Sequence, residues 1–313
     1  MDTAAVACFE ASRHRLASLA YRLLGSAADA EDTVQDAFLR WQAADREYIE
    51  VPEAWLTKIV THLSLDRLRS AKARRERAVG AWMPEPLLDG DPMLGPADTV
   101  EQRESVTLAV LTLMERLSPM ERAVYVLREA FAYSHGEIAE ILGITESGSQ
   151  QHLHRARRRI AAARNDTVID HVSARGIVAA FVEAAASGRT ERLVALLTDD
   201  ATGISDGAGF GRTGKLIRFP TPERIARAMR AGFKPTPAKR RLAGGSPSIH
   251  AAKVNGCPAV LVSLDERVAG VVILEIRGDK IAGVRGIAAP SRLGRLTAEW
   301  MRQEHDAPLI GSW

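Results

Sequence analysis

Cysteine is scarce in this sequence: its 313 residues include only two, Cys8 and Cys257, far apart in the chain. That spacing excludes a CxxC-type zinc or redox motif and gives no support to a disulfide framework, so a reducing cytoplasm fits best. Long apolar runs are missing as well. No stretch reaches the ~18 residues of a membrane span, and the N-terminal segment lacks the apolar core of a signal peptide. We therefore expect a cytoplasmic protein without a membrane partner.

A strong charge bias is also absent, since the formal net charge is only +3, with 26% charged and 46% hydrophobic residues. This composition indicates a globular protein, and the length indicates about two domains. Bulk charge gives no argument for nucleic-acid binding. Because a basic patch attracts phosphate locally whatever the total charge, the distribution of bases along the chain matters more.

The first eighty residues have the apolar spacing of three helices. Residues 9–44 predict two of them, with a break at Gly25-Ser26 and acidic residues in the first turn of the second. Residues 53–77 predict a third, amphipathic helix that ends in a cluster of bases. Two interpretations stay open: the basic end binds nucleic acid, or it is a solvated helix terminus whose bases complement the helix dipole.

Residues 80–100 are rich in proline and acidic residues and show little periodicity, which is typical of a linker between helical modules. A plain linker rarely contains tryptophan, yet this one includes the stretch WMPEPL at 82–87. Either this stretch is an anchor that docks on another part of the chain, or it caps the preceding helix.

A helix-turn-helix is the most informative pattern of the chain. Ser118, followed by a proline and then by Glu121, gives a strong helix start. Residues 133–160 then predict a short helix, a turn at Gly143 and a second helix capped by Thr145. Glycine suits this turn because a tight interhelical turn demands a positive φ.

The second helix of this motif is strongly basic. In helix-turn-helix proteins the early residues of that helix face base edges, and arginines further along hold phosphates. Candidates for base readout are Glu146, Ser147, Gln150 and Gln151, and glutamine can pair bidentately with adenine. The alternative is a generic two-helix hairpin.

These stretches resemble a known family, in its order. DAEDTVQDAFLRWQ at 29–42 and WLTKIVTHLSLDRLRS at 55–70 look like region two of extracytoplasmic-function sigma factors. LSPMERAVYVLREAFAYSHGEIAEILGIT with HRARRRI, at 117–160, looks like region four. The resemblance implies an alternative sigma factor that binds core RNA polymerase and promoter DNA, without a cofactor, a metal or catalysis of its own.

The resemblance also implies roles for single residues. Polymerase binding falls to Asp32, Gln35, Asp36 and Leu39. Capture and melting of the minus-ten element, with bases held in pockets and phosphates by arginine, fall to Trp55, His62, Asp66, Arg67 and Arg69. Reading of the minus-thirty-five element falls to Thr145, Glu146, Ser147, Gln150, Gln151, His154, Arg155, Arg157 and Arg158. The acidic linker would pass through the polymerase groove that RNA later occupies.

The sequence departs from the family within the second helix of the motif. Ser149 and His152 stand where members usually carry aliphatic residues, and Gly148 within a helix costs about 1 kcal/mol relative to alanine. These residues predict weaker packing of the recognition helix than of its neighbours.

Residues beyond 165 follow a different pattern. Two helices are expected within 171–197, a strand near 200–205, then a glycine-rich turn and a helix over 222–231. The β-branched runs that follow, of which RLAGG is the first, are separated by Gly, Asn and Asp turns and predict an antiparallel meander. This half is therefore expected to be an α+β domain. The glycine-rich turn is not a phosphate loop, because no GKS or GKT follows it.

This half resembles the SnoaL-like domains of the nuclear-transport-factor-two-like superfamily, a cone whose sheet wraps an apolar pocket. NGCPAV, VVILEI and KIAGVRGIAAPSRL carry that likeness. With WMPEPL in the linker, the architecture resembles the sigma factor J-like group, in which this domain is fused to the sigma core and adjusts its activity. The implied regulatory contacts are Trp82, Pro84, Glu85, Pro86, Asp206 and Gly207.

We thus expect a multidomain chain. Its parts are an all-α sigma region two at 1–79, the acidic linker at 80–104, an all-α region four with the helix-turn-helix at 105–165, an α+β SnoaL-like regulatory domain at 166–295 and a tail at 296–313. Two other hypotheses stay open. In one, the C-terminal cone binds a small ligand or turns it over. Turnover would require a catalytic set, for which Asp206 and His250 could meet in the cavity, although a lone histidine in a strand more often has a structural role. In the other, the chain is a repressor, which the block at 29–42 disfavours.

Overall fold

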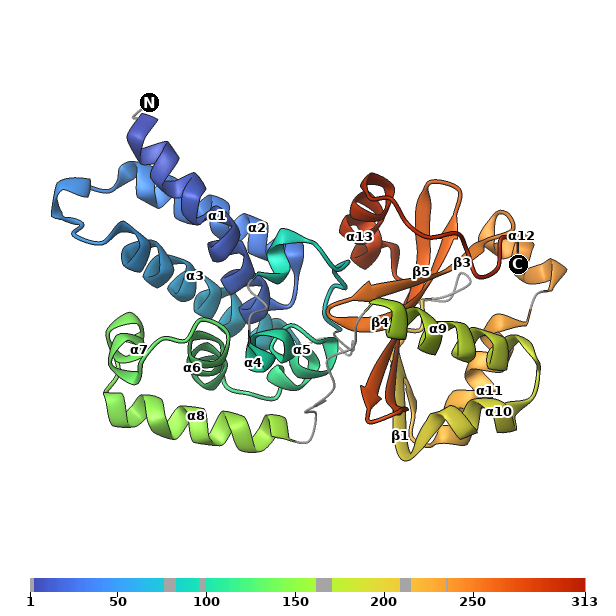
Figure 1. Cartoon of the computed structure of the whole chain (residues 1–313). Coiled ribbons are helices and arrows are strands. Elements are labelled where there is room, and N and C mark those ends of the chain that lie inside the picture. The colour runs from blue at the N-terminus through green and yellow to red at the C-terminus, as the bar shows by residue number, and fades with distance from the viewer. Residues whose placement is uncertain are drawn as a thin grey trace. The chain divides into compact units, whose positions relative to one another are not determined.

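The computed structural model describes residues 3–75, 83–95, 99–161, 171–208, 215–234 and 236–312. They form two compact units, drawn in Figure 1. The first lies within Met1–Val79 and Gly90–Arg164, and the second within Gly80–Asp89 and Asn165–Trp313. The linker is therefore divided, because its first part folds with the C-terminal half of the chain.

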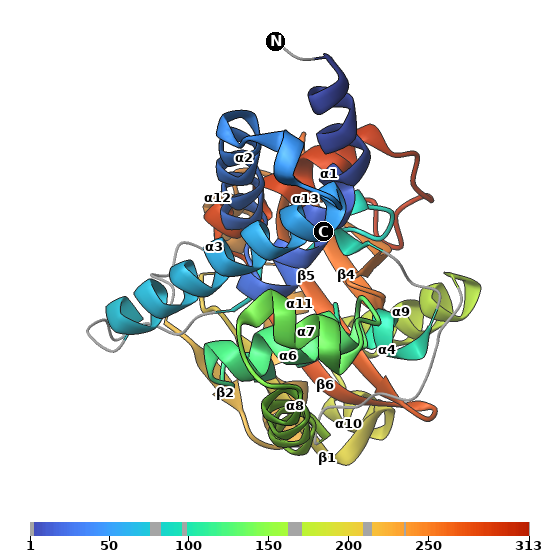
Figure 2. The ribbon, with the colours of Figure 1, turned by 90° about the vertical axis from the view of Figure 1, so that its left-hand side faces the viewer.

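The first unit is entirely helical. Its elements are α1 (Thr3–Leu24), α2 (Ala27–Ala43), the short 3-10 helix η1 (Arg46–Tyr48), α3 (Pro52–Arg75), the 3-10 helix η2 (Pro92–Leu94), α4 (Val100–Glu104), α5 (Leu108–Met114), α6 (Pro119–Glu129), α7 (His135–Leu142) and α8 (Glu146–Ile160). Helices α1, α2 and α3 pack together, and α6, α7 and α8 form a second group that also contacts α1 and α3. Figure 2 shows α8 almost end-on below α6 and α7.

The predicted apolar stripes of α1 and α2 are confirmed. Leu16, Leu19 and Leu23 of α1 and Val34 and Ala37 of α2 are buried, as expected for a shared core. In α3 the stripe is displaced from the expected one. Its buried apolar residues are Leu56, Val60, Leu65 and Leu68, whereas Trp55, Ile59 and Leu63 are half-buried.

The second unit combines helices with a six-stranded sheet of order β2-β1-β6-β5-β4-β3. Its elements are α9 (His171–Ala186), α10 (Thr190–Leu196), β1 (Leu197–Ser205), β2 (Ile217–Phe219), α11 (Pro222–Phe233), α12 (Pro237–Ala243), β3 (Ser248–Val254), β4 (Cys257–Leu264), β5 (Arg267–Arg277), β6 (Lys280–Ile287) and α13 (Pro290–Arg302). The predicted meander is confirmed, since β3 to β6 pair antiparallel in chain order.

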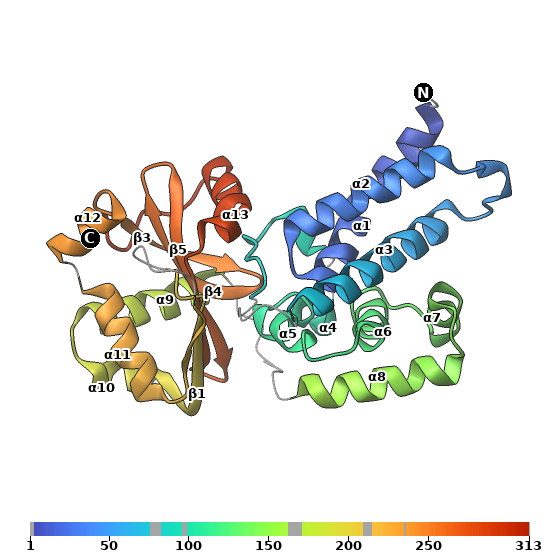
Figure 3. The same ribbon diagram turned by 180° about the vertical axis from the view of Figure 1, so that it is seen from behind.

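The sheet carries helices on both faces (Figure 3). Val272, Leu274 and Ile276 of β5 point towards α9 and α11, where they join a core that contains Phe181 and Phe233. Side chains alternate along a strand, so Val271 and Ile273 point to the other face, where α13 packs against β5. The domain thus has an apolar core on each side of its sheet.

Several elements differ from the expectations. The helix expected over 100–117 is two helices, because Thr107 caps a new one at Leu108. RLAGG is not a strand, since Pro237–Ala243 forms α12. Strand β1 pairs parallel to β6 and so lies outside the meander. The boundary expected at 295 falls inside α13, an amphipathic helix that buries Leu293 and Trp300. None of the helices in the described ranges is long and apolar enough to cross a membrane.

Candidate nucleic-acid interface

The outer face of α2 presents most of the residues expected to bind polymerase. Asp32, Gln35 and Leu39 are exposed, and Leu39 is 56% exposed although it is apolar. Asp36 lies closer to α3 and accepts a hydrogen bond of 2.7 Å from Arg67. The fourth candidate of this set is therefore joined to a residue expected to hold minus-ten DNA.

Residues of α3 fall into two groups. Asp66 and Arg69 are exposed and pair with each other at 3.1 Å. Trp55 packs on Trp41 with a centroid separation of 5.6 Å, and the Nε2 atom of His62 lies 2.8 Å from the carbonyl oxygen of Ile141 in α7. Trp55 and His62 thus contact other parts of the helical unit.

Aromatic and arginine side chains join α1 and α3 to the segment after α6. Arg15 donates hydrogen bonds to Thr57 at 3.1 Å and to the Tyr133 hydroxyl at 2.5 Å, and it lies over the Phe131 ring. Arg22 is fully buried and donates to Ser105 at 2.9 Å, and burial lowers its pKa to about 10. No local sequence pattern indicates these contacts, because they join residues far apart in the chain.

Local signals build the helix-turn-helix as predicted. Ser118 and Glu121 form a capping box at the start of α6, and Ser134 and Glu137 form another at the start of α7. Gly143 has a φ of 65° after α7, and the Thr145 hydroxyl accepts a hydrogen bond of 3.0 Å from the Gly148 amide. Gly148 therefore lies in the first turn of α8, where the cap satisfies its amide, and not in mid-helix.

The inner face of α8 consists of Ser149, Leu153, Ala156 and Ile160, all buried. Their spacing of four, three and four residues forms one stripe along a helix. Ser149 replaces an aliphatic contact with a polar one, since its hydroxyl lies 2.8 Å from Nδ1 of His135 in α7. Leu153, and not the residue at 152, fills the apolar position.

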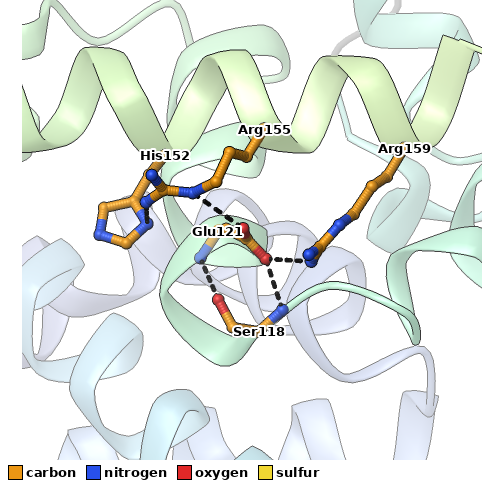
Figure 4. Close-up of polar contacts among 5 residues, drawn as sticks. All are labelled: Ser118, Glu121, His152, Arg155 and Arg159. Atoms are coloured by element: carbon orange, nitrogen blue, oxygen red, sulfur yellow. Dashed lines mark hydrogen bonds and ion pairs between the residues drawn. The ribbon is translucent and has the colours of Figure 1, made fainter.

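Two buried glutamates bind the arginines that flank this stripe. Glu121 accepts hydrogen bonds from Nε of Arg155 at 3.2 Å and from Nη1 of Arg159 at 2.7 Å (Figure 4). Glu129 accepts from Arg157 at 3.0 and 2.7 Å. Burial alone would raise the pKa of Glu121, but hydrogen bonds from Ser118, the charge of Arg159 and a hydrogen bond from Arg155 hold it below its ordinary value.

The linker segment Met83–Asp89 is hydrogen-bonded to the turn between β3 and β4. Leu87 donates its amide to the Asn255 side-chain oxygen at 2.8 Å and accepts the Asn255 amide at 2.9 Å. Asp89 accepts from Gly256 at 2.8 Å and forms an ion pair with Lys253 at 3.1 Å. This segment is thus part of the sheet domain.

The residues expected to make regulatory contacts lie within this second unit, except Trp82, which is outside the described residues. Pro84 and Pro86 are buried and Glu85 is half-buried. Asp206 is buried and accepts the amides of Ala288 and Ala289 at 3.0 and 2.9 Å, and Gly207 follows it with a φ of 68°. Burial lowers the pKa of Arg292, while the charges of Asp206 and Glu85 act in the opposite direction, so Arg292 lies within the electrostatic reach of both.

Asp206 and His250 do not meet as an acid–base pair. Asp206 follows β1 and His250 lies in β3, and three strands separate β1 from β3 in the sheet. Neighbouring strands are about 4.8 Å apart, which places the two elements roughly 19 Å apart. His250 instead contacts Ser263 at 3.1 Å and packs edge-on against Trp300.

Two family models match this chain: Sigma-70 region 2 over residues 8–74, and Sigma-70, region 4 over residues 107–160. The ECF RNA polymerase sigma factor SigJ of Mycobacterium tuberculosis is 40% identical over 220 residues, covering 67% of this chain and 70% of the relative. The probable ECF RNA polymerase sigma factor SigI of the same species is 35% identical over 298 residues, covering 94% of this chain and 96% of the relative. The chain belongs to the ECF sigma factor family.

A solved structure extends this likeness to both units. The crystal structure of the M. tuberculosis extracytoplasmic function sigma factor SigJ matches with a TM-score of 0.68 and 30% identity, covering 92% of this chain and 97% of that one. The predicted relation to the sigma factor J-like group and the predicted fold class are therefore confirmed. As an ECF sigma factor, the protein binds core RNA polymerase and promoter DNA and directs transcription initiation.

Proposed function

We propose that this ECF sigma factor binds the clamp helices of the largest polymerase subunit through the outer face of α2. Asp32, Gln35 and Leu39 support this role because all three are exposed on one helix. An exposed leucine between acidic and polar residues combines apolar contact area with a charged rim, which is the usual build of a protein interface. Asp36 assists from the edge of this face, through its bond to Arg67.

The minus-ten element is captured by α3 in this proposal. Asp66 and Arg69 are exposed and available to single-stranded DNA, and Arg67 and the half-buried Trp55 line the same helix. His62 joins them once its contact with the Ile141 carbonyl opens. The minus-thirty-five element is read by α8, which begins at the Thr145 cap and leaves Glu146, Ser147, Gln150, Gln151 and His154 exposed.

The C-terminal domain regulates this activity by holding the linker. The observation that carries this proposal is the pair of hydrogen bonds between Leu87 and Asn255, because they make a segment between regions two and four part of the sheet domain. The linker cannot lie in a polymerase groove and on the sheet at the same time. The charge of Glu85, a residue of the same linker segment, acts on Arg292 together with that of Asp206.

We place this activity in the cytoplasm, where core polymerase and DNA are found. A small ligand of the C-terminal domain would bind among the apolar side chains between the sheet and α9 to α11, such as Phe181 and Phe233. Binding there would alter the domain that holds the linker, and so would act on the same equilibrium.

The experiment is transcription with purified core polymerase and a genomic fragment library. Three forms are compared: the full-length chain, a chain truncated after residue 165, and a full-length Asn255→Gly variant that removes the side-chain bond to Leu87. Specific transcripts from the full-length or truncated form support the sigma assignment, and the variant should shift activity in the same direction as truncation. A chain that neither binds core nor starts a transcript would overturn the proposal for α2, α3 and α8. Equal activity of all three forms would overturn regulation through the linker.

A further inference from the structure

The outer face of α8 is a single exposed stripe, which we call the reading face. It consists of Ser147, Gln151, His154 and Arg158, spaced four, three and four residues apart. This spacing matches that of the buried stripe on the opposite side of the helix, so the reading face points directly away from the packed helices.

The other arginines of α8 lie on the flanks and are paired with acids. Arg155 and Arg159 on one flank share the carboxylate of Glu121, and Arg157 on the other flank pairs with Glu129. The two glutamate side chains are only 5% and 4% exposed, whereas the three arginines are about half exposed. Each glutamate is therefore an inward anchor for an arginine that lies across the surface.

Glu121 is itself fixed by its own helix. Its carboxylate accepts the Ser118 amide at 2.9 Å, and its amide donates to the Ser118 hydroxyl at 3.3 Å. Arg155 is further oriented by donating from Nη2 to Nδ1 of His152 at 3.0 Å, as Figure 4 shows. An arginine held at both ends of its guanidinium has little freedom to follow a phosphate.

We propose that Arg155 and Arg159 are positioning residues, which Glu121 uses to set the angle of α8 on α6, and that Arg158 is the phosphate-binding arginine of the helix. If Arg155 or Arg159 turned to a phosphate, the buried carboxylate of Glu121 would lose part of its compensating positive charge, which costs free energy. Arg158 forms no ion pair with any described residue, so it breaks no such pair when it binds a phosphate. Gln151 and His154 are then the side chains placed for base edges. This inference rests on the proposed function of α8.

Salt dependence of DNA binding separates the two kinds of arginine. Each phosphate neutralised adds about 0.9 to the slope of log affinity against log salt concentration, and a loss of folding does not mimic a change of slope. The probe is a labelled duplex of mixed sequence without a promoter, and the protein is the full chain. Arg158→Gln is compared with Arg155→Gln, a matched change three residues away, and with Glu121→Gln.

We expect Arg158→Gln to reduce the magnitude of the salt slope by about 0.9, the value for one phosphate contact. Arg155→Gln should keep the wild-type slope and lower the thermal midpoint of the helical unit. Glu121→Gln should steepen the slope, because it releases two arginines, and Glu121→Asp should restore part of the wild-type behaviour. Equal loss of slope in Arg155→Gln and Arg158→Gln would overturn the assignment. So would an unchanged slope in Arg158→Gln, or a wild-type chain that does not bind the duplex at low salt. The probe contains no promoter, so these outcomes are independent of the transcription experiment.

Discussion

Asn255→Gly should release the linker from the C-terminal domain without disturbing the turn that bears it. Asn255 has a φ of 50°, a conformation that glycine adopts freely, so the backbone of the turn tolerates the change. The substitution removes the acceptor of the Leu87 amide, which lies 2.8 Å away in a fully buried position. A buried amide left without an acceptor costs about 1–3 kcal/mol, which raises the population of the detached linker roughly 5- to 150-fold.

Hydrogen exchange of the linker amides measures this change directly. Exchange of the Leu87 and Asp89 amides should accelerate by that factor, since in the wild-type chain the first donates to Asn255 in the turn and the second to the Lys253 carbonyl near the end of β3. Asp265→Gly is the matched control, because Asp265 also has a φ of 50° and lies in the turn between β4 and β5. Unchanged exchange at Leu87 in Asn255→Gly, or equal acceleration in Asp265→Gly, would refute the reasoning.

Three further predictions concern the other sites. Leu39→Ala should weaken core polymerase binding by about tenfold and change the free energy of unfolding by less than about 0.5 kcal/mol. Binding affinity and thermal midpoint are measured beside those of Val172→Ala, which changes another exposed apolar residue, on α9. A normal affinity of the Leu39 variant would contradict the proposed polymerase contact. The pKa of Glu121 is lowered in the folded state, so its carboxylate stabilises the protein above the unfolded pKa, and this contribution is lost as pH falls through the folded pKa. The loss of stability caused by Glu121→Gln should therefore be largest near neutral pH and vanish in acid. A loss that does not depend on pH would be inconsistent with this. Asp206→Asn should destabilise the second unit by about 1–3 kcal/mol, because the amides of Ala288 and Ala289 lose a charged acceptor. A denaturation curve of that unit measures this loss. A variant as stable as the wild type would argue against the anchoring role of Asp206.

Local signals carried most of the helical prediction. Ser118, Gly143 and Thr145 act through hydrogen bonds and backbone angles that involve residues three or four positions away, and each has the predicted geometry. Where tertiary packing decides, the prediction was less accurate. The buried stripe of α3 is displaced because α3 also contacts α6 and α7, and a wider packed face brings Thr57, Thr61 and Ser64 inside.

The ion pairs of the arginines on α8 could not be predicted from the sequence. Glu121 was expected as a cap residue and has that role, but its second role depends on how α8 crosses α6. The same holds for Asn255. An Asn-Gly pair predicts a turn, and nothing in its neighbours indicates that the turn binds a segment more than a hundred residues earlier in the chain.

The division of the linker between the two units sets how far regions two and four can separate. Residues 76–99 join the end of α3 to the start of α4, and fully extended they would span about 80 Å. Promoter elements named for positions ten and thirty-five lie about 25 base pairs apart, which is roughly 85 Å of duplex at 3.4 Å per base pair. Even fully extended, this segment would therefore fall slightly short of that separation. Each residue kept on the sheet at Met83–Asp89 subtracts from that reach, so in the proposed regulation the C-terminal domain would act on promoter spacing through the length of chain that it leaves free.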